Sequence, residues 1–177
     1  MKIDILNLKE GVTEYFESLG PSELDLVNLD FRLKDKAFVH TTVEKRGNKV
    51  KITIDAKFTL ILTCSRCLEE FEQDFNTVDE YFVKPGQEEL EPEKYLSDED
   101  IFSIFAPTQE IDTTPLVRDS IILSVPMKPL CKEDCKGLCP VCGVNLNKSI
   151  CEHVGLDKEK DEWRRKLEEI KKKLEKK

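Results

Sequence analysis

The sequence predicts an α+β fold in which an antiparallel β-meander, or a partly open barrel, is followed by a short helix, a cysteine-rich segment and a C-terminal helix. Apolar residues alternate with polar or β-branched ones over residues 50–62, which indicates a long strand with one buried face. Helix signals follow at residues 115–123, and five of the seven cysteines lie within residues 131–151.

Shorter strand patterns surround the long one. Residues 1–8 suit a short strand with Ile3 and Ile5 turned inward, and residues 24–42 suit one or two strands. The tripeptide Arg46-Gly47-Asn48 is a turn signal, so a hairpin is expected there. Residues 71–83 are expected to form the return strand after the long one.

The second half of the chain contains less regular structure. Residues 84–100 are rich in Glu, Asp and Pro, which predicts a solvated acidic loop. Pro115 suits a first helical position, with Asp112 or Thr113 as the N-cap, and Pro126 ends that helix. The tail carries one apolar stripe at helical spacing, which predicts an amphipathic helix. The stripe consists of Trp163, Leu167, Ile170 and Leu174.

Composition limits the classes of function. The 177 residues have a formal net charge of -8, which argues against an extensive nucleic-acid footprint. No stretch approaches the ~20 apolar residues of a membrane span, and residues 1–20 show no secretory signal, so a cytoplasmic protein is expected. The charge is uneven, since residues 69–112 hold 15 acidic and two basic side chains, whereas residues 158–177 hold six and ten.

The cysteines carry the clearest chemical signal. In a reducing compartment, clustered thiols are more often metal ligands than disulfides. Cys139 and Cys142 are separated by two residues, and Cys151 and His153 follow, so these four residues predict one tetrahedral zinc site.

Four cysteines remain, and they predict a second zinc site that joins a hairpin tip to the C-terminal segment. These are Cys64, Cys67, Cys131 and Cys135. An alternative partition places Cys135 with Cys139 and Cys142 and leaves Cys131 spare. The Cys64/Cys67 pair also suits a redox site, although such pairs usually open a helix in a βαβ unit. An iron–sulfur cluster on Cys135, Cys139 and Cys142 would need a much larger body after the motif.

The domain organisation follows from these patterns. We expect an antiparallel β-rich domain over residues 1–126 with an acidic loop at 84–100, a zinc-binding segment over 127–156 and a basic amphipathic helical tail over 157–177. Phosphate-binding and nucleophile motifs are missing, and a zinc ion with four protein ligands has no position for water. We therefore expect no enzymatic activity, no small-molecule substrate and no membrane partner.

Several segments resemble the YceD family, described as large ribosomal RNA subunit accumulation proteins. The likeness lies in Thr63-Cys64-Ser65-Arg66-Cys67-Leu68-Glu69, in residues 116–126, in the run from Leu130-Cys131 through Cys135-Lys136-Gly137-Leu138-Cys139-Pro140-Val141-Cys142-Gly143 to Asn147, and in Cys151-Glu152-His153. The resemblance implies a non-enzymatic cytoplasmic factor that supports synthesis or accumulation of large-subunit ribosomal RNA.

Three functional hypotheses remain open. The first is a ribosome-biogenesis factor that contacts RNA through a local basic patch. The candidate residues are Lys45, Arg46, Lys49 and Lys51 in the hairpin, and Arg164, Arg165, Lys171, Lys172 and Lys173 in the tail. The second is an acidic adaptor that holds a basic ribosomal protein without touching RNA. The third is a thiol oxidoreductase.

Overall fold

The computed structural model describes residues 1–5, 7–27, 29–47, 49–85, 103–106, 110–153 and 171. The chain divides into two compact units. The first unit comprises Met1–Thr63 and Glu70–Pro129, and the second comprises Cys64–Glu69 and Leu130–Lys177. The second unit therefore includes a six-residue turn that comes from between two strands of the first.

The first unit is built on a six-stranded sheet. Its strands are β2 (Gly11–Leu19), β3 (Phe31–Leu33), β4 (Ala37–Arg46), β5 (Lys49–Thr63), β6 (Glu70–Pro85) and β7 (Ser103–Ala106). The order across the sheet is β2-β4-β5-β6-β7, and β3 pairs with β5 beyond the end of β4. The strands β2, β4, β5 and β6 pair antiparallel, as predicted for a meander.

The strand β5 forms the centre of this sheet. Its even-numbered residues from Val50 to Leu62 are buried, and its odd-numbered residues are more exposed. This confirms the long strand that the alternating sequence predicted. The pairing of Arg46 with Lys49 confirms the hairpin at residues 46–48, and β6 is the predicted return strand.

The sheet is open, with β2 and β7 at its edges, which fits the predicted meander rather than the partly open barrel. Two features of the sheet differ from the prediction. The strand β7 pairs parallel with β6. The strand β2 was not predicted, because its exposed face carries the apolar Val12 and Phe16 while its other face carries Thr13 and Glu17. Hydrophobic alternation cannot identify the buried face of such a strand.

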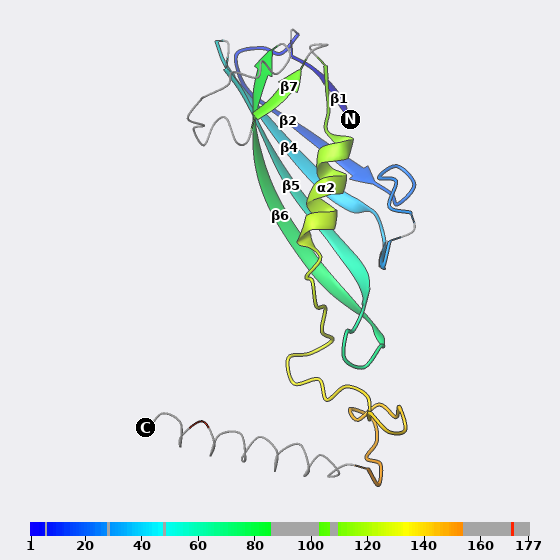
Figure 1. The fold of residues 1–177 in the computed structure, drawn as a ribbon. Coiled ribbons are helices and arrows are strands. Elements are labelled where there is room, and N and C mark those ends of the chain that lie inside the picture. The colour runs from blue at the N-terminus through cyan, green and yellow to red at the C-terminus, as the bar shows by residue number, and fades with distance from the viewer. Residues whose placement is uncertain are drawn as a thin grey trace. The chain divides into compact units, whose positions relative to one another are not determined.

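One helix packs on the sheet. The helix α2 (Thr114–Ser124) buries Val117 and Ile121, and it lies over one face of the sheet in Figure 1. This confirms the predicted short helix. Thr113 occupies the N-cap position without capping through its side chain, and Asp112 instead accepts a hydrogen bond from the backbone N–H of Thr114 at 3.0 Å.

A second, two-stranded sheet lies at the start of this helix. It pairs β1 (Lys2–Asp4) with β8 (Glu110–Asp112) and buries Ile3 and Ile111. The core of the first unit thus combines the inner face of the large sheet, α2 and this small sheet.

Two predicted features lie largely outside the described residues. Of the acidic segment 84–100, the structure describes Lys84 and Pro85, which end β6. Of the predicted C-terminal helix it describes Lys171 alone, so that helix is not confirmed. No helix in the described part of the chain is long and apolar enough to cross a membrane.

Substitution of the β5 core should destabilise the first unit. Leu60 is completely buried, whereas Leu123 on α2 is 83% exposed. Leu60→Ala should lower the free energy of unfolding by about 2–5 kcal/mol, because it leaves a cavity in the core. Leu123→Ala serves as the matched control and should change it by less than about 0.5 kcal/mol. Urea denaturation of both variants at the same metal content measures the difference, and equal costs would contradict this account of the core.

Candidate metal centre

The second unit contains two groups of metal-ligating side chains. Site 1 is formed by Cys139, Cys142, Cys151 and His153, and site 2 is formed by Cys64, Cys67, Cys131 and Cys135. Within each group, the potential ligand atoms all lie within 4.8 Å of one another. The two groups use all seven cysteines of the chain, and each could hold a metal ion.

The two Cys-x-x-Cys turns have the same backbone hydrogen bonds. The N–H of Cys64 donates to the carbonyl of Glu69 at 2.9 Å, and that of Leu68 donates to the carbonyl of Cys64 at 2.9 Å. In the second turn, the N–H of Cys139 donates to Val144 at 2.8 Å and that of Gly143 donates to Cys139 at 2.9 Å.

The residue after the second cysteine of each turn has a positive φ. It is 71° at Gly143 and 58° at Leu68. Glycine adopts this conformation without strain, whereas a leucine does so at a cost. Cysteine spacing predicted both turns, and the glycine signal for the positive φ was present at Gly143 but not at Leu68.

The spacing of the sulfur atoms in site 2 fits a tetrahedral ion. The Sγ atoms of Cys64 and Cys135 lie 3.8 Å apart, and those of Cys67 and Cys131 lie 3.7 Å apart. A tetrahedral ion with sulfur ligands at about 2.3 Å separates neighbouring sulfur atoms by about 3.8 Å. Cys64, Cys67 and Cys135 are also buried, which shields such an ion from water.

Site 1 contains the only histidine among these ligands. The Nδ1 atom of His153 is shielded from solvent and has no hydrogen-bond partner among the described residues. A metal ion would supply the missing partner of this nitrogen. Cys139 is buried while Cys142 is exposed, so site 1 is the more open of the two groups.

The cysteines of site 2 differ in their ionisation. Burial raises the pKa of Cys64, but the backbone N–H groups of Cys131, Cys67 and Arg66 outweigh it and lower this pKa to about 6. Burial and the neighbouring thiols raise the pKa of Cys131 to about 12.

The other two thiols of site 2 show the same division. The N–H of Glu69 favours the thiolate of Cys67, yet burial and the hydrogen bond with Cys64 raise its pKa on balance. Burial disfavours the thiolate of Cys135, but hydrogen bonds from Asn147 and the N–H of Gly137 leave its pKa lowered. Without a cation, the group therefore carries both thiolates and thiols at neutral pH.

Backbone N–H groups also activate site 1. Those of Cys142 and Val141 lower the pKa of Cys139 to about 7, whereas burial and the neighbouring Cys139 raise the pKa of Cys151. Each site thus contains one thiol with a lowered pKa and another with a raised pKa, the pattern expected where several like charges share one place.

Two residues outside the predicted ligands support site 2. The Arg66 guanidinium donates to the carbonyl of Cys135 at 3.0 Å, and the Arg66 carbonyl accepts from the N–H of Leu138 at 3.2 Å. The Asn147 side chain donates to the Cys135 sulfur at 3.3 Å and accepts from the N–H of Lys136 at 2.9 Å. Such contacts fix the position of a ligand and favour its thiolate form.

Further contacts join the turn to the C-terminal segment. The Lys148 ammonium lies 2.5 Å from a carboxylate oxygen of Glu69, and this hydrogen bond together with Asn145 lowers the pKa of Glu69. Gly137 has a φ of 75°, and a β-carbon there would lie 3.1 Å from the Arg66 carbonyl oxygen. Cysteine spacing could not reveal these supporting residues, because polar residues near a knuckle carry no distinctive pattern.

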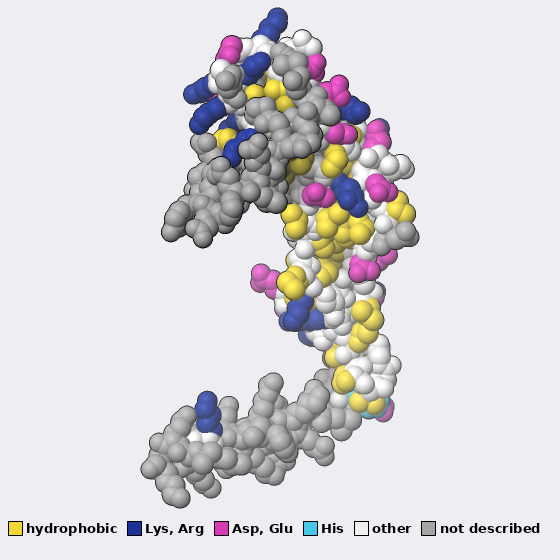
Figure 2. Space-filling view, turned by 45° about the horizontal axis from the view of Figure 1, so that its top comes forward, with side chains coloured by type: hydrophobic (Ala, Val, Ile, Leu, Met, Phe, Trp, Pro, Cys, Tyr) yellow, Lys and Arg dark blue, Asp and Glu magenta, His cyan; other side chains and the backbone are white. Residues whose placement is uncertain are grey.

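The basic hairpin residues that were predicted to contact RNA lie beside hydrogen-bond acceptors of the protein itself. The Lys45 ammonium donates to the carbonyls of Leu8 and Ile5 at 2.9 and 3.2 Å. Arg46 pairs with Glu44, and Lys51 pairs with Glu80 at 2.7 Å. Near the top of Figure 2, Lys and Arg side chains gather with Asp and Glu side chains beside them.

The remaining predicted basic residues lie in the tail. Lys171 is exposed, and the other four are outside the described residues. They are Arg164, Arg165, Lys172 and Lys173.

Comparison with known proteins gives the family. A family model described as "Large ribosomal RNA subunit accumulation protein YceD" matches residues 51–171. The chain belongs to the YceD family. This confirms the resemblance seen in the sequence, and all eight potential metal ligands lie within the matched range.

Curated relatives of this YceD protein come from plants and bacteria. It is 25% identical over 147 residues to "Large ribosomal RNA subunit accumulation protein YCED homolog 1, chloroplastic" from Arabidopsis thaliana, covering 77% of this chain and 44% of the relative. The homologue of the same description from Zea mays is 33% identical over 132 residues, covering 62% and 45%. "Uncharacterized protein YlbN" from Bacillus subtilis (strain 168) is 27% identical over 129 residues, covering 72% and 70%.

The chain therefore spans less than half the length of the two plant relatives. No solved structure matches it. The family's name describes an accumulation protein rather than an enzyme.

Removal of the Asn147 side chain should weaken metal binding at site 2. Asn147→Ala deletes the hydrogen bond to the Cys135 sulfur and the link to Lys136. Loss of such a contact typically lowers metal affinity by about 10- to 100-fold. Chelator competition in a Cys139→Ser background, which disables site 1, measures this affinity. Asn76→Ala in the sheet is the matched control, and an unchanged affinity in Asn147→Ala would show that Asn147 does not support the site.

Metal binding at site 2 should release protons at neutral pH. Because the pKa of Cys131 is raised to about 12 and that of Cys67 is raised above its usual value, at least these two thiols must lose a proton when an ion binds. As the pH falls through about 6, Cys64 also becomes protonated, so proton release should increase and the apparent affinity should fall. Titration calorimetry of Cys139→Ser in buffers of different ionisation enthalpy counts these protons. Metal binding without proton release at pH 7 would contradict this assignment.

Proposed function

We propose that this protein is a non-enzymatic zinc-binding factor that supports accumulation of large-subunit ribosomal RNA and ribosome biogenesis. Membership of the YceD family, whose name states large ribosomal RNA subunit accumulation, is the observation that carries the proposal. The names of the two plant relatives support it.

The chemistry of the two groups supports zinc as the metal. Site 2 offers four sulfur ligands and site 1 offers three sulfur ligands and one imidazole, which are the ligand sets of structural zinc sites. Four protein ligands leave no position for a reactive water, so such an ion would stabilise structure rather than perform hydrolysis. Convergence of four thiols, rather than two, favours a metal site over a redox pair.

Zinc at site 2 would stabilise the packing of the C-terminal segment on the turn Cys64–Glu69. Two of its ligands lie in that turn and the other two are Cys131 and Cys135. Binding of an ion to both segments adds its binding free energy to the stability of this unit. The protein's contribution to ribosome assembly would then depend on the bound metal through folding and not through catalysis.

The proposal also includes the predicted domain organisation. It consists of a β-rich domain over residues 1–126, a zinc-binding segment over 127–156 and a basic helical tail over 157–177. Direct contact with ribosomal RNA, through the basic residues named above, belongs to the proposal as well. The proposed compartment is that of ribosome assembly, which is the cytoplasm in the sequence-based prediction and the chloroplast for the plant relatives by their names.

Metal content and ribosomal RNA should change together in cysteine variants. We expect two zinc equivalents per chain in the wild type and one in Cys64→Ser or Cys139→Ser, as measured by elemental analysis. In cells whose own copy is depleted, the wild-type protein should restore the ratio of large- to small-subunit ribosomal RNA, and the two serine variants should restore it less.

Leu123→Ala is the control and should behave as the wild type, because its side chain is exposed on α2. A wild-type chain with a single equivalent that Cys64→Ser leaves unchanged would contradict a metal at site 2. A ribosomal RNA ratio that does not respond to depletion would contradict the proposed cellular role.

A further inference from the structure

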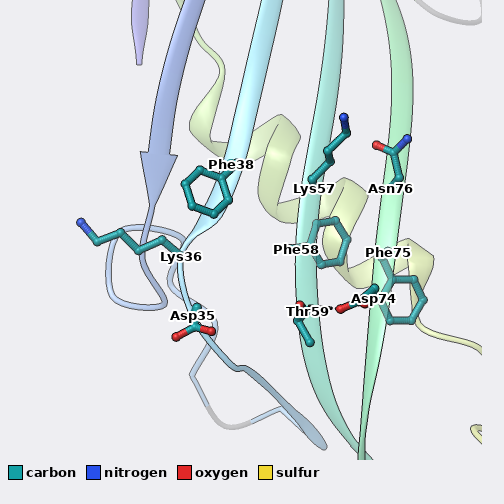
Figure 3. Close-up of a pocket in the computed structure, with 9 residues that line it drawn as sticks. All are labelled: Asp35, Lys36, Phe38, Lys57, Phe58, Thr59, Asp74, Phe75 and Asn76. Atoms are coloured by element: carbon teal, nitrogen blue, oxygen red, sulfur yellow. Dashed lines mark hydrogen bonds between the residues drawn. The ribbon is translucent and has the colours of Figure 1, made fainter.

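The large sheet exposes aromatic side chains on the face turned away from α2. The Ser120 hydroxyl on α2 donates to the Thr77 hydroxyl at 2.8 Å, so Thr77 and its partner Ala56 face the helix. Adjacent residues along a strand point to opposite faces. Lys57, Asn76 and Phe38 therefore share the other face, as Figure 3 shows.

Four large apolar side chains on this face are more than half exposed. They are Val12 at 61%, Phe16 at 74%, Phe38 at 67% and Val78 at 58%. Strand register places Phe16, His40, Asp55 and Val78 in one row across the sheet. The rings of Phe16 and His40 are stacked, with centroids 4.4 Å apart and planes 4° apart. Clustered exposed apolar groups of this kind typically mark an interaction surface.

Carboxylates surround these aromatic rings. Glu14 lies 3.7 Å from the His40 Nε2 atom, and Asp55 follows His40 in the same row. One carboxylate oxygen of Asp55 is shielded from solvent and accepts no hydrogen bond from the described residues.

A groove of about 400 Å³ opens beside Phe38. Lys57, Asp74 and Asp35 line it together with Phe38, and the Thr59 hydroxyl donates to Asp74 at 2.7 Å (Figure 3). With Glu14 and Asp55 beside the groove, this part of the face holds four carboxylates against the two ammonium groups of Lys36 and Lys57. This part of the face is therefore aromatic and net acidic.

We propose that this face binds an extended, arginine-containing segment of a partner protein. A guanidinium group stacks on aromatic rings and donates in a planar fork to carboxylates, and both kinds of acceptor lie on this face. Phe16 and Phe38 would accept the stacked groups, while Asp55 and Asp74 would accept hydrogen bonds. All of these residues belong to the first unit, so the proposal is independent of the metal sites.

Net charge distinguishes this partner from other candidates. Single-stranded RNA also stacks on exposed aromatic rings, but its phosphates require a basic groove. Here the acidic side chains would repel the phosphates, whereas they attract a basic peptide. A lysine would pair with the carboxylates but would lose the planar stacking and the forked hydrogen bonds.

Peptide titration of the full-length protein tests this surface. The probe is an eight-residue fluorescent peptide of alternating Arg and Ser, and binding is followed by anisotropy at about 0.1 M salt. The Phe16→Ala/Phe38→Ala variant should bind it about 5- to 10-fold more weakly, as expected for the loss of two cation–π contacts. The same peptide with Lys in place of Arg should bind the wild type more weakly than the arginine peptide.

Matched variants separate this surface from general charge attraction. Leu123→Ala/Ile150→Ala removes two side chains that are 83% and 85% exposed elsewhere and should leave the affinity unchanged. Asp55→Asn should weaken binding about twofold or more, whereas Glu110→Gln on β8 should not. Equal peptide affinity in the wild type and the double phenylalanine variant would overturn the proposal. So would an oligouridine that binds the wild type more tightly than the arginine peptide and loses affinity in that variant.

Discussion

The sulfur atoms of Cys67 and Cys131 lie 3.7 Å apart although the two residues are separated by 64 positions in the chain. Four ionisable thiols that meet in this way repel one another as thiolates, and burial together with the neighbouring thiols raises the pKa of Cys131 to about 12. A dication would remove that repulsion and would bind both segments. The arrangement of the second unit depends on the convergence of these four thiols. The hydrogen bonds of Arg66 and Asn147 to Cys135 hold one of the four in position.

The two units are stabilised by different interactions. In the first unit, buried aliphatic residues of β5 pack beneath α2. A substitution there lowers the free energy of unfolding according to the number of buried methylene groups that it removes. In the second unit, the buried positions include Cys64, Cys67, Cys135 and Cys139, and polar contacts surround them. Changes in pH or chelation should therefore affect the second unit far more than the first.

These two kinds of structure suit a protein that binds other molecules. Metal ions with four protein ligands would give rigidity without an open coordination position, and the acidic aromatic part of the sheet face offers a surface for a basic protein segment. The predicted basic hairpin residues Lys45, Arg46 and Lys51 already contact acceptors within the protein. Charge at that hairpin is thus partly neutralised.

Local sequence determined the elements whose stability is local. Alternation specified β5, turn residues specified its hairpin with β4, and Pro115 marked the start of α2, because each signal lies within a few residues. Cysteine spacing likewise identified the two sets of side chains that the structure brings together. Only the tertiary structure decided that β2 forms an edge strand, that β7 runs parallel to β6, and that Arg66 and Asn147 support Cys135. Those features depend on partners distant in the chain, and the residues that make them have no periodicity or spacing of their own.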